Sequence, residues 1–236
     1  MRYRRDKLGP EGPLTRDDAE MSLVWKFLDE RSRGIFSGFT WPIPGAGHEA
    51  AAWVDSGDVV ACERGVHACD LDDLAWWMSA QLWEIELDGP VVADLRKIVA
   101  PRGRLVRLVA EWPSIGRELA EWAVWRVRDH VAGVLDAEGD SALAERVRHA
   151  HDLGASVEVV AGSGHDAAGA AGVAVAQLID ASDDVANPIL ACHDAARAAG
   201  HAATITNRSI ETYKSAFAAE RLLQSRWIAG RLGLVG

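Results

Sequence analysis

The apolar residues of this chain change their period near residue 112. Before that point short apolar runs predominate, and residues 82–87 alternate between apolar and acidic side chains. After it, apolar residues recur every three or four positions, as at Val124, Val127, Val131 and Val134. Side chains alternate between the two faces of a strand, whereas helical side chains return to one face about every 3.6 residues. The pattern therefore predicts an α+β fold with a strand-rich N-terminal half and an all-helical C-terminal half.

Three parts are predicted along the chain. Residues 1–21 are expected to form a disordered arm, because they are charged and rich in turn-forming residues. Residues 22–112 are expected to form a mixed, β-rich domain, in which an antiparallel or mixed sheet carries one short helix near 71–80. Residues 113–236 are expected to form a helical domain that packs against the sheet half.

Two local patterns refine this outline. Residues 23–28 and 35–41 are apolar and rich in β-prone side chains, and the Arg-Ser-Arg-Gly segment between them predicts a hairpin loop. Within the helical half, only residues 157–160, with the sequence Val-Glu-Val-Val, resemble a strand.

The chain is acidic, with 35 Asp and Glu residues against 25 Lys and Arg residues and a net charge of −10. A negative field of this size repels nucleic acid and anionic lipid. The three cysteines are an odd number, which does not indicate a secreted disulfide framework, and no apolar run suits a signal peptide or a membrane span. We therefore expect a cytoplasmic protein whose partner is a protein or a small molecule, with no affinity for nucleic acid or membrane, and a homo-oligomer is compatible with the sequence.

Cys62, His67 and Cys69 form the first candidate site. Thiolate and imidazole are ligands that zinc prefers, and a hairpin can present His67 and Cys69 on one face. The spacing matches no standard zinc motif. The favoured alternative is that both cysteines are small buried side chains and that His67 is a hydrogen-bonded core histidine.

Glu84 and Glu86 form the second candidate site, and His67 is a further catalytic candidate. Two carboxylates two residues apart lie on the same face of a strand, where they can perform acid–base chemistry or bind a ribose. The alternative, which the alternating pattern favours, is a solvent-facing strand surface.

Tryptophan is the third feature, because the chain contains 10 tryptophans and six of them lie within the first 83 residues. They either line a ligand pocket or form the core of a short-stranded sheet. Trp76 and Trp77 point about 100° apart on a helix, so at most one of them is expected to lie fully in the core. The other is the candidate contact for a cofactor or a partner.

A basic run lies between residues 95 and 110 and contains no acidic residue. It can grip a phosphate or an acidic partner, but in a chain of this net charge we favour internal charge balance. Its members are Arg96, Lys97, Arg102, Arg104 and Arg107.

The segment that holds the first two candidate sites resembles a known family. Its pattern is a Cys, two residues, a Gly, an apolar residue and His-Ala-Cys, followed by a short helix and a strand that here has the sequence Leu-Trp-Glu-Ile-Glu-Leu-Asp-Gly at 82–89. The chain is similar over about residues 23–110, and partly over its closing helix, to a bacterial and phage domain family of unknown function. The resemblance implies a domain type but no reaction.

A weaker similarity concerns the order of these elements. A strand bearing His67, a helix containing Trp76 and a strand that ends in the Glu86-Leu-Asp-Gly-Pro segment are similar in layout to part of the small ADP-ribosyltransferase fold, notably the rifampicin-modifying type. The resemblance implies NAD binding in a cleft within residues 23–110, with Glu86 as the first catalytic carboxylate. The His-Gly-Thr segment and the tyrosine of that group are absent from the corresponding places.

The sequence contains no complete catalytic motif. A Ser-His-Asp order, a His-Glu-x-x-His motif and a pair of Cys-x-x-Cys motifs are all missing. We therefore expect a non-catalytic binding or accessory protein, and the alternative is an NAD-using enzyme similar to ADP-ribosyltransferases. The sequence assigns no cofactor.

Overall fold

The computed structural model describes residues 24–45, 50–60, 64–94, 96–163, 170–205 and 207–235. The arm predicted at 1–21 lies outside these residues. The chain divides into two compact units, a sheet unit of Met1–Pro113 with Ser225–Gly236 and a helical unit of Ser114–Gln224. Both boundaries between the units fall inside helices.

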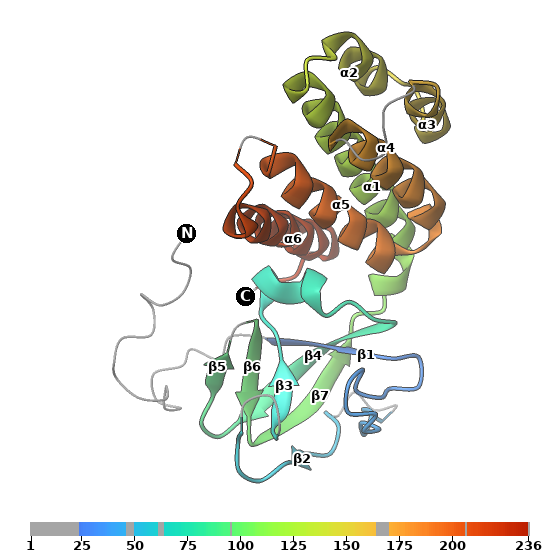
Figure 1. Ribbon diagram of the computed structural model, residues 1–236. Coiled ribbons are helices and arrows are strands. Elements are labelled where there is room, and N and C mark those ends of the chain that lie inside the picture. The colour runs from blue at the N-terminus through green and yellow to red at the C-terminus, as the bar shows by residue number, and fades with distance from the viewer. Residues whose placement is uncertain are drawn as a thin grey trace. The chain divides into compact units, whose positions relative to one another are not determined.

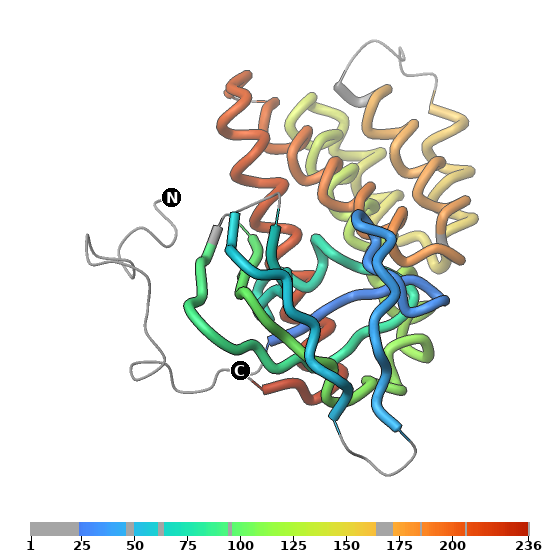
Figure 2. Tube along the Cα trace, turned by 90° about the horizontal axis from the view of Figure 1, so that it is seen from below, coloured from blue at the N-terminus to red at the C-terminus, as the bar shows by residue number. Residues whose placement is uncertain are grey.

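The structure confirms the α+β class (Figure 1). All strands of the described residues belong to the sheet unit, and all of their pairings are antiparallel. They form a four-stranded sheet in the order β1-β4-β7-β2 and a three-stranded sheet in the order β3-β6-β5, and Figure 2 follows them from β1 in blue to β7 in green. The strands are β1 (Val24–Leu28), β2 (Val54–Asp55), β3 (Val66–Ala68), β4 (Gln81–Asp88), β5 (Val92–Asp94), β6 (Lys97–Ala100) and β7 (Arg102–Leu108).

Strand β4 contains the strand that the alternating pattern of residues 82–87 predicts, and it lies between two other strands in the larger sheet. It pairs with β1 on one side and with β7 on the other. Leu82 and Trp83 are both buried although they are adjacent, because neighbouring side chains of a strand point to opposite faces and both faces are covered here. One buried apolar cluster of this unit consists of Val24, Leu28, Trp41, Ala51, Val66, Ala68, Trp83, Ile85 and Leu105.

The strand predicted at 35–41 is wrong, because this segment forms a loop. Isolated bridges join Leu28 to Gly34 and Arg33 to Thr40, and no regular ladder forms within this fully described segment. Gly38 has a φ angle of 65°, a left-handed conformation that interrupts a strand and that glycine adopts without strain. The loop therefore leaves the side chains of Ile35 and Phe36 exposed.

The short helix predicted near 71–80 is η1 (Leu71–Trp76), a 3₁₀ helix. The side chain of Asp70 caps it by accepting a hydrogen bond of 3.1 Å from the backbone N–H of Asp72. Its backbone N–H at Ala75 donates to Ser225 Oγ at 3.0 Å, so a residue from the far end of the chain belongs to the sheet unit.

The described helices after the sheet begin with α1 and end with α6, and each of these two helices crosses a unit boundary. Asp140, Asp152 and Asn187 cap three of the helices with their side chains. None of the described helices combines the length and the hydropathy that a membrane span requires. The helices are α1 (Trp112–Ala137), α2 (Ser141–Arg148), α3 (Leu153–Ala161), α4 (Ala170–Asp183), η2 (Asp184–Ala186), α5 (Pro188–Ala203) and α6 (Ile210–Leu232).

The strand-like segment at 157–160 is part of helix α3, so that expectation is wrong. The Asp152 side chain starts the helix by accepting a 2.7 Å hydrogen bond from the N–H of Ala155. Ser156 and Val160, four positions apart, are buried on one helical face. Packing on this face overrides the weak strand preference of the valines.

Helix α6 buries polar side chains within the helical unit. Glu220 is 2% exposed and accepts two hydrogen bonds from Arg126 of α1, at 2.7 and 2.6 Å. His130 Nε2 lies 3.3 Å from the same carboxylate. Gln224 donates to the carbonyl of Cys192 in α5 at 2.8 Å. Hydrogen bonding, more than apolar burial, therefore specifies how this part of α6 packs on α1 and α5.

Gly200 of α5 allows a close approach to α6. A Cβ atom at this position would lie 2.6 Å from Cε2 of Tyr213. We expect Gly200→Ala to lower the free energy of unfolding by about 1 kcal/mol, because an overpacking cost of about 1–3 kcal/mol exceeds the helix-propensity gain of about 1 kcal/mol. Urea denaturation followed by circular dichroism measures the change.

The matched control is Gly133→Ala in α1. A Cβ atom at Gly133 meets no atom within 4 Å. This substitution is expected to stabilise the protein by about 0.5–1 kcal/mol, since only the propensity gain remains. Two substitutions with the same sign of effect would contradict the close packing at Gly200.

Candidate functional site

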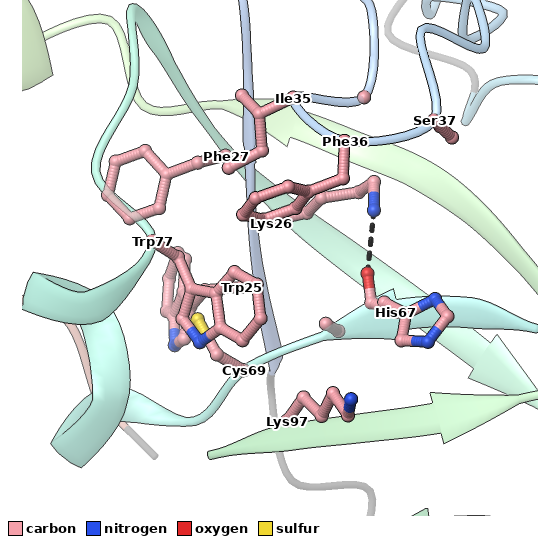
Figure 3. A pocket seen from close by; sticks show the side chains of 12 residues that line it. Trp25, Lys26, Phe27, Ile35, Phe36, Ser37, His67, Cys69, Trp77 and Lys97 are labelled. Atoms are coloured by element: carbon pink, nitrogen blue, oxygen red, sulfur yellow. Dashed lines mark hydrogen bonds between the residues drawn. The ribbon is translucent and has the colours of Figure 1, made fainter. Parts of the chain in front are cut away.

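A cavity of about 580 Å³ lies within the sheet unit (Figure 3). Three segments supply most of its wall: strand β1, the loop at 34–37, and strand β3 with Cys69 directly after it. Trp77, next to η1, and Lys97 of β6 complete the wall. Apolar and aromatic side chains, two lysines and one histidine therefore meet in one cavity.

The cavity lies beside strand β1, at the edge of the larger sheet. Strand β1 is the edge strand of the larger sheet, and its free side meets Cys69 through two backbone hydrogen bonds between Trp25 and Cys69, both 2.8 Å. Among the described residues the pairing of β1 with the β3 segment stops at this bridge, because β3 forms its ladder with β6. The cavity is lined by the residues on both sides of the interrupted pairing.

Lys26 lies at the centre of this arrangement. Its Nζ donates a hydrogen bond of 2.6 Å to the carbonyl oxygen of His67 and lies 4.6 Å from the centre of the Trp41 ring (Figure 3 shows the bond). The carbonyl and the ring face both favour a cation. Burial nevertheless lowers the pKa of Lys26 to about 8.

His67 and Cys69 are both electrically neutral at pH 7. Burial first, and then the positive charges of Lys26 and Lys97, lower the pKa of His67 below its usual value. Burial raises the pKa of the Cys69 thiol, which is 2% exposed. His67 can therefore accept a proton at neutral pH, whereas Cys69 is not a thiolate nucleophile.

Aromatic side chains form the apolar part of the wall. The rings of Phe36 and Trp77 meet edge to face with 5.8 Å between their centres. The Trp77 indole is held in place because its Nε1 donates to the Arg96 carbonyl at 2.8 Å. Phe36 is 83% exposed, so the loop carries it at the rim of the cavity.

Trp76 and Trp77, the two candidate contacts, separate as their helical positions predict. Trp77 lines the cavity, whereas the guanidinium carbon of Arg96 lies 3.3 Å from the centre of the Trp76 ring. Trp76 is outside the lining of the cavity and contacts a cation of its own chain. The assignment of either residue to a cofactor stays a prediction.

The zinc hypothesis is not resolved by the described residues. His67 and Cys69 both line the cavity, but Cys62 lies outside the described residues. Within the part of the chain that the structure describes, no three His, Cys, Asp or Glu side chains are placed to hold a metal ion together. A zinc site that includes Cys62 stays a prediction.

Glu84 and Glu86 take part in an ion-pair ladder between β4 and β7. Three of the five members of the basic run at 95–110 supply the cations, which is the internal charge balance that the sequence favours for them. Neither carboxylate is among the residues that line the cavity. The three pairs are Glu84–Arg107 at 3.1 Å, Glu86–Arg104 at 2.7 Å and Asp88–Arg102 at 3.0 Å.

A bulge in β7 makes this ladder compatible with the core. Glu84 pairs with Arg107 but the next residue, Ile85, pairs with Leu105, so β7 carries one extra residue at this point. Without the bulge, Leu105 and Arg107 would share a face. With it, Leu105 stays fully buried while Arg107 reaches Glu84.

Lys26 and Phe36 are two of the site residues that sequence reasoning missed. A lysine inside the apolar run at 23–28 is a signal that could have been used, because an interior lysine requires special surroundings. Phe36 gave no such signal, since its run resembled a buried strand.

Comparison of the chain with protein-family models, with curated proteins and with solved structures found no match. The resemblances described from the sequence therefore stay predictions.

Proposed function

We propose that this chain is a small-molecule-binding protein, and that its cavity in the sheet unit takes a compact anion with a flat, aromatic body. A volume of about 580 Å³ is within the range of about 300–1,000 Å³ that is typical of ligand sites. The wall combines apolar and aromatic side chains with a small number of charged and polar side chains, Lys26, Ser37, His67 and Lys97.

The lining of the cavity carries this proposal. Lys26 and Lys97 both line it, and among the described lining residues there is no Asp or Glu. The chain has a net charge of −10, whereas the lining of this cavity has two cationic side chains and no acidic one. The charge of the lining is therefore opposite in sign to that of the chain. Such a cavity attracts an anion, and the attraction is strengthened by the low-dielectric aromatic wall.

The cavity contains lysines, although most basic residues of the chain are arginines. The chain contains only four lysines, Lys7, Lys26, Lys97 and Lys214, and arginine supplies the other basic side chains. The strand ladder and the buried pair of α6 both use arginine. Two of the four lysines line one cavity, where a compact cation leaves more room for a ligand than a guanidinium does.

The alternative, an ADP-ribosyltransferase-like enzyme, receives less support from the geometry. Its first catalytic carboxylate, Glu86, accepts a 2.8 Å hydrogen bond from Arg104, forms an ion pair with the same side chain at 2.7 Å, and is not part of the cavity lining. NAD is accordingly the comparison ligand in the test below.

Calorimetric titration with para-toluate tests the binding proposal. We expect a single site whose affinity falls as salt is added, because the attraction is partly electrostatic. Benzyl alcohol, a neutral aromatic compound of similar size, is expected to bind more weakly. Binding of NAD without binding of para-toluate would reverse the choice between the two functions.

Phe36→Ser is expected to weaken the binding of para-toluate about tenfold, since an aromatic contact is worth about 0.5–1.5 kcal/mol beyond the area that it buries. The variant should fold normally, because Phe36 is 83% exposed. Ile43→Ser is the matched control: Ile43 is 59% exposed in the same loop region but does not line the cavity. Equal loss of affinity in both variants would contradict the assignment of the site.

A further inference from the structure

We propose that the Lys26 amine forms an imine with aldehydes that enter this cavity, so that the site captures carbonyl compounds covalently. The inference rests on the proposed function, because the anionic aromatic class defined there delivers the aldehyde to the amine. It assigns a reactive group to the site in addition to ligand binding.

Lys26 lines the cavity, and two contacts fix the place of its nitrogen. The Nζ atom is held by the His67 carbonyl at 2.6 Å and by the Trp41 ring at 4.6 Å. A neutral amine needs only one of its two hydrogens for the bond to the carbonyl oxygen, so its lone pair stays available. Among the described residues, the ion pairs include none at Lys26 that would hold it as an ammonium ion.

The titratable groups around Lys26 in the cavity lining include no negative charge that would stabilise its ammonium ion. The titratable groups that face it are His67 of β3, Cys69 directly after β3, and Lys97 of β6, and none of them is a carboxylate. Burial lowers the pKa of Lys26 to about 8. At pH 7 about one molecule in ten therefore carries a neutral amine, which is roughly a few hundred times the fraction for an ordinary exposed lysine.

The proposed step balances without any further reagent. The Lys26 nitrogen forms a bond to the carbonyl carbon, the carbon–oxygen π bond breaks, and one amine proton moves to the oxygen to give a carbinolamine. The hydroxyl group then leaves as water with the second amine proton, and a carbon–nitrogen double bond forms. His67 lines the same cavity and is neutral, so it can accept a proton from nitrogen and return it to the departing hydroxyl group.

The experiment uses the full chain with para-carboxybenzaldehyde, followed by borohydride reduction and peptide mass spectrometry. We expect one reduced adduct, on the peptide that contains Lys26, and a labelling yield that rises with a midpoint near pH 8. Because the chain has only four lysines, the adduct can be assigned to one residue. Lys214→Met should leave the adduct unchanged, since Lys214 is an exposed residue of α6.

Lys26→Arg tests whether the Lys26 amine is the nucleophile. It keeps the positive charge but removes the nucleophile, because arginine stays protonated. The variant is expected to form no adduct. An adduct on Lys26→Arg protein at the same yield as on the unmodified chain would overturn the proposal.

Two further outcomes would also overturn it and are distinguishable. If para-toluate binds but no adduct appears on Lys26 even at pH 9, the imine inference fails and the binding proposal stands. If para-toluate does not bind and no adduct forms, both proposals fail. Adducts spread evenly over all lysines would show ordinary surface reactivity and would equally reject the inference.

Discussion

Replacing Glu220 with glutamine is expected to lower the free energy of unfolding by about 3 kcal/mol. The Glu220 carboxylate is 2% exposed, and Arg126 donates two hydrogen bonds to it. Removing one partner of a buried pair leaves the other charge uncompensated, at a cost of about 3–5 kcal/mol. We place the value at the low end because the Arg126 side chain is 29% exposed, which lets water solvate part of the guanidinium.

Two variants make this prediction specific. Asp129→Asn removes a carboxylate that is 53% exposed and pairs with Arg128, so the expected loss is below about 1 kcal/mol. Combining Glu220→Leu with Arg126→Leu should recover much of the stability lost in the single variants, because no uncompensated charge remains. A single-site loss for Glu220→Gln no larger than that of Asp129→Asn would contradict the role of the buried pair.

The same carboxylate is expected to make the helical unit sensitive to acid. Burial alone would raise the pKa of Glu220, but the hydrogen bonds and charges of Arg126 and His130 outweigh it and lower the pKa below 4.5. A group with a lowered pKa in the folded state stabilises the fold above its unfolded pKa and loses this contribution as the pH falls through the folded value. Unfolding midpoints measured below pH 4.5 should therefore fall less steeply for Glu220→Gln than for the unmodified chain.

Replacing Lys26 with methionine is expected to raise the free energy of unfolding by about 2 kcal/mol at pH 7. Lowering the pKa of Lys26 from 10.5 to about 8 corresponds to a penalty of about 3 kcal/mol for keeping the ammonium ion in the fold. Methionine has no such penalty, but the His67 carbonyl loses its 2.6 Å hydrogen bond, which costs about 1 kcal/mol. A residue that destabilises its own fold is typical of a functional site.

The pH dependence identifies Lys26 as the source of this gain. Between pH 8 and 10.5 the unfolded chain binds the Lys26 proton more strongly than the folded chain does, so the stability of the unmodified protein rises with pH across this window. The advantage of Lys26→Met should shrink over the same window, as urea denaturation at several pH values can measure. Lys214→Met, at an exposed lysine, should show no such trend. A constant difference between Lys26→Met and the unmodified chain would show that packing, not charge burial, causes the gain.

The sequence alone predicted the elements whose apolar residues follow a simple strand or helix period. The strand at 82–87 and the long helix after residue 112 follow from periodicity, because each element must present one apolar face to a core. The same reasoning failed at 35–41 and 157–160, where the apolar residues have a strand-like composition. Gly38, which has a left-handed backbone, interrupts the first segment, so that it forms a loop. The second segment lies within helix α3, which Asp152 caps.

The candidate site was likewise predicted only in part from the sequence. Sequence reasoning selected His67, Cys69 and Trp77, and the structure places all three in the wall of one cavity. It also selected Glu84 and Glu86, which ion pairs with β7 hold away from that cavity. The pairing partner of a carboxylate depends on strand register and on the bulge in β7, and neither is encoded in a short window of sequence.

By itself, the sequence of this protein determined the α+β class, the change from strands to helices near residue 112, and the acidic net charge. These properties depend on side-chain periodicity and composition, which are local or additive quantities. Only the tertiary structure decided that Lys26 meets His67, Trp41 and Lys97 around one cavity, because segments distant in the chain supply these residues. A pKa depends on the burial and the charges that surround a group in space, so the unusual lysine exists only in the folded chain.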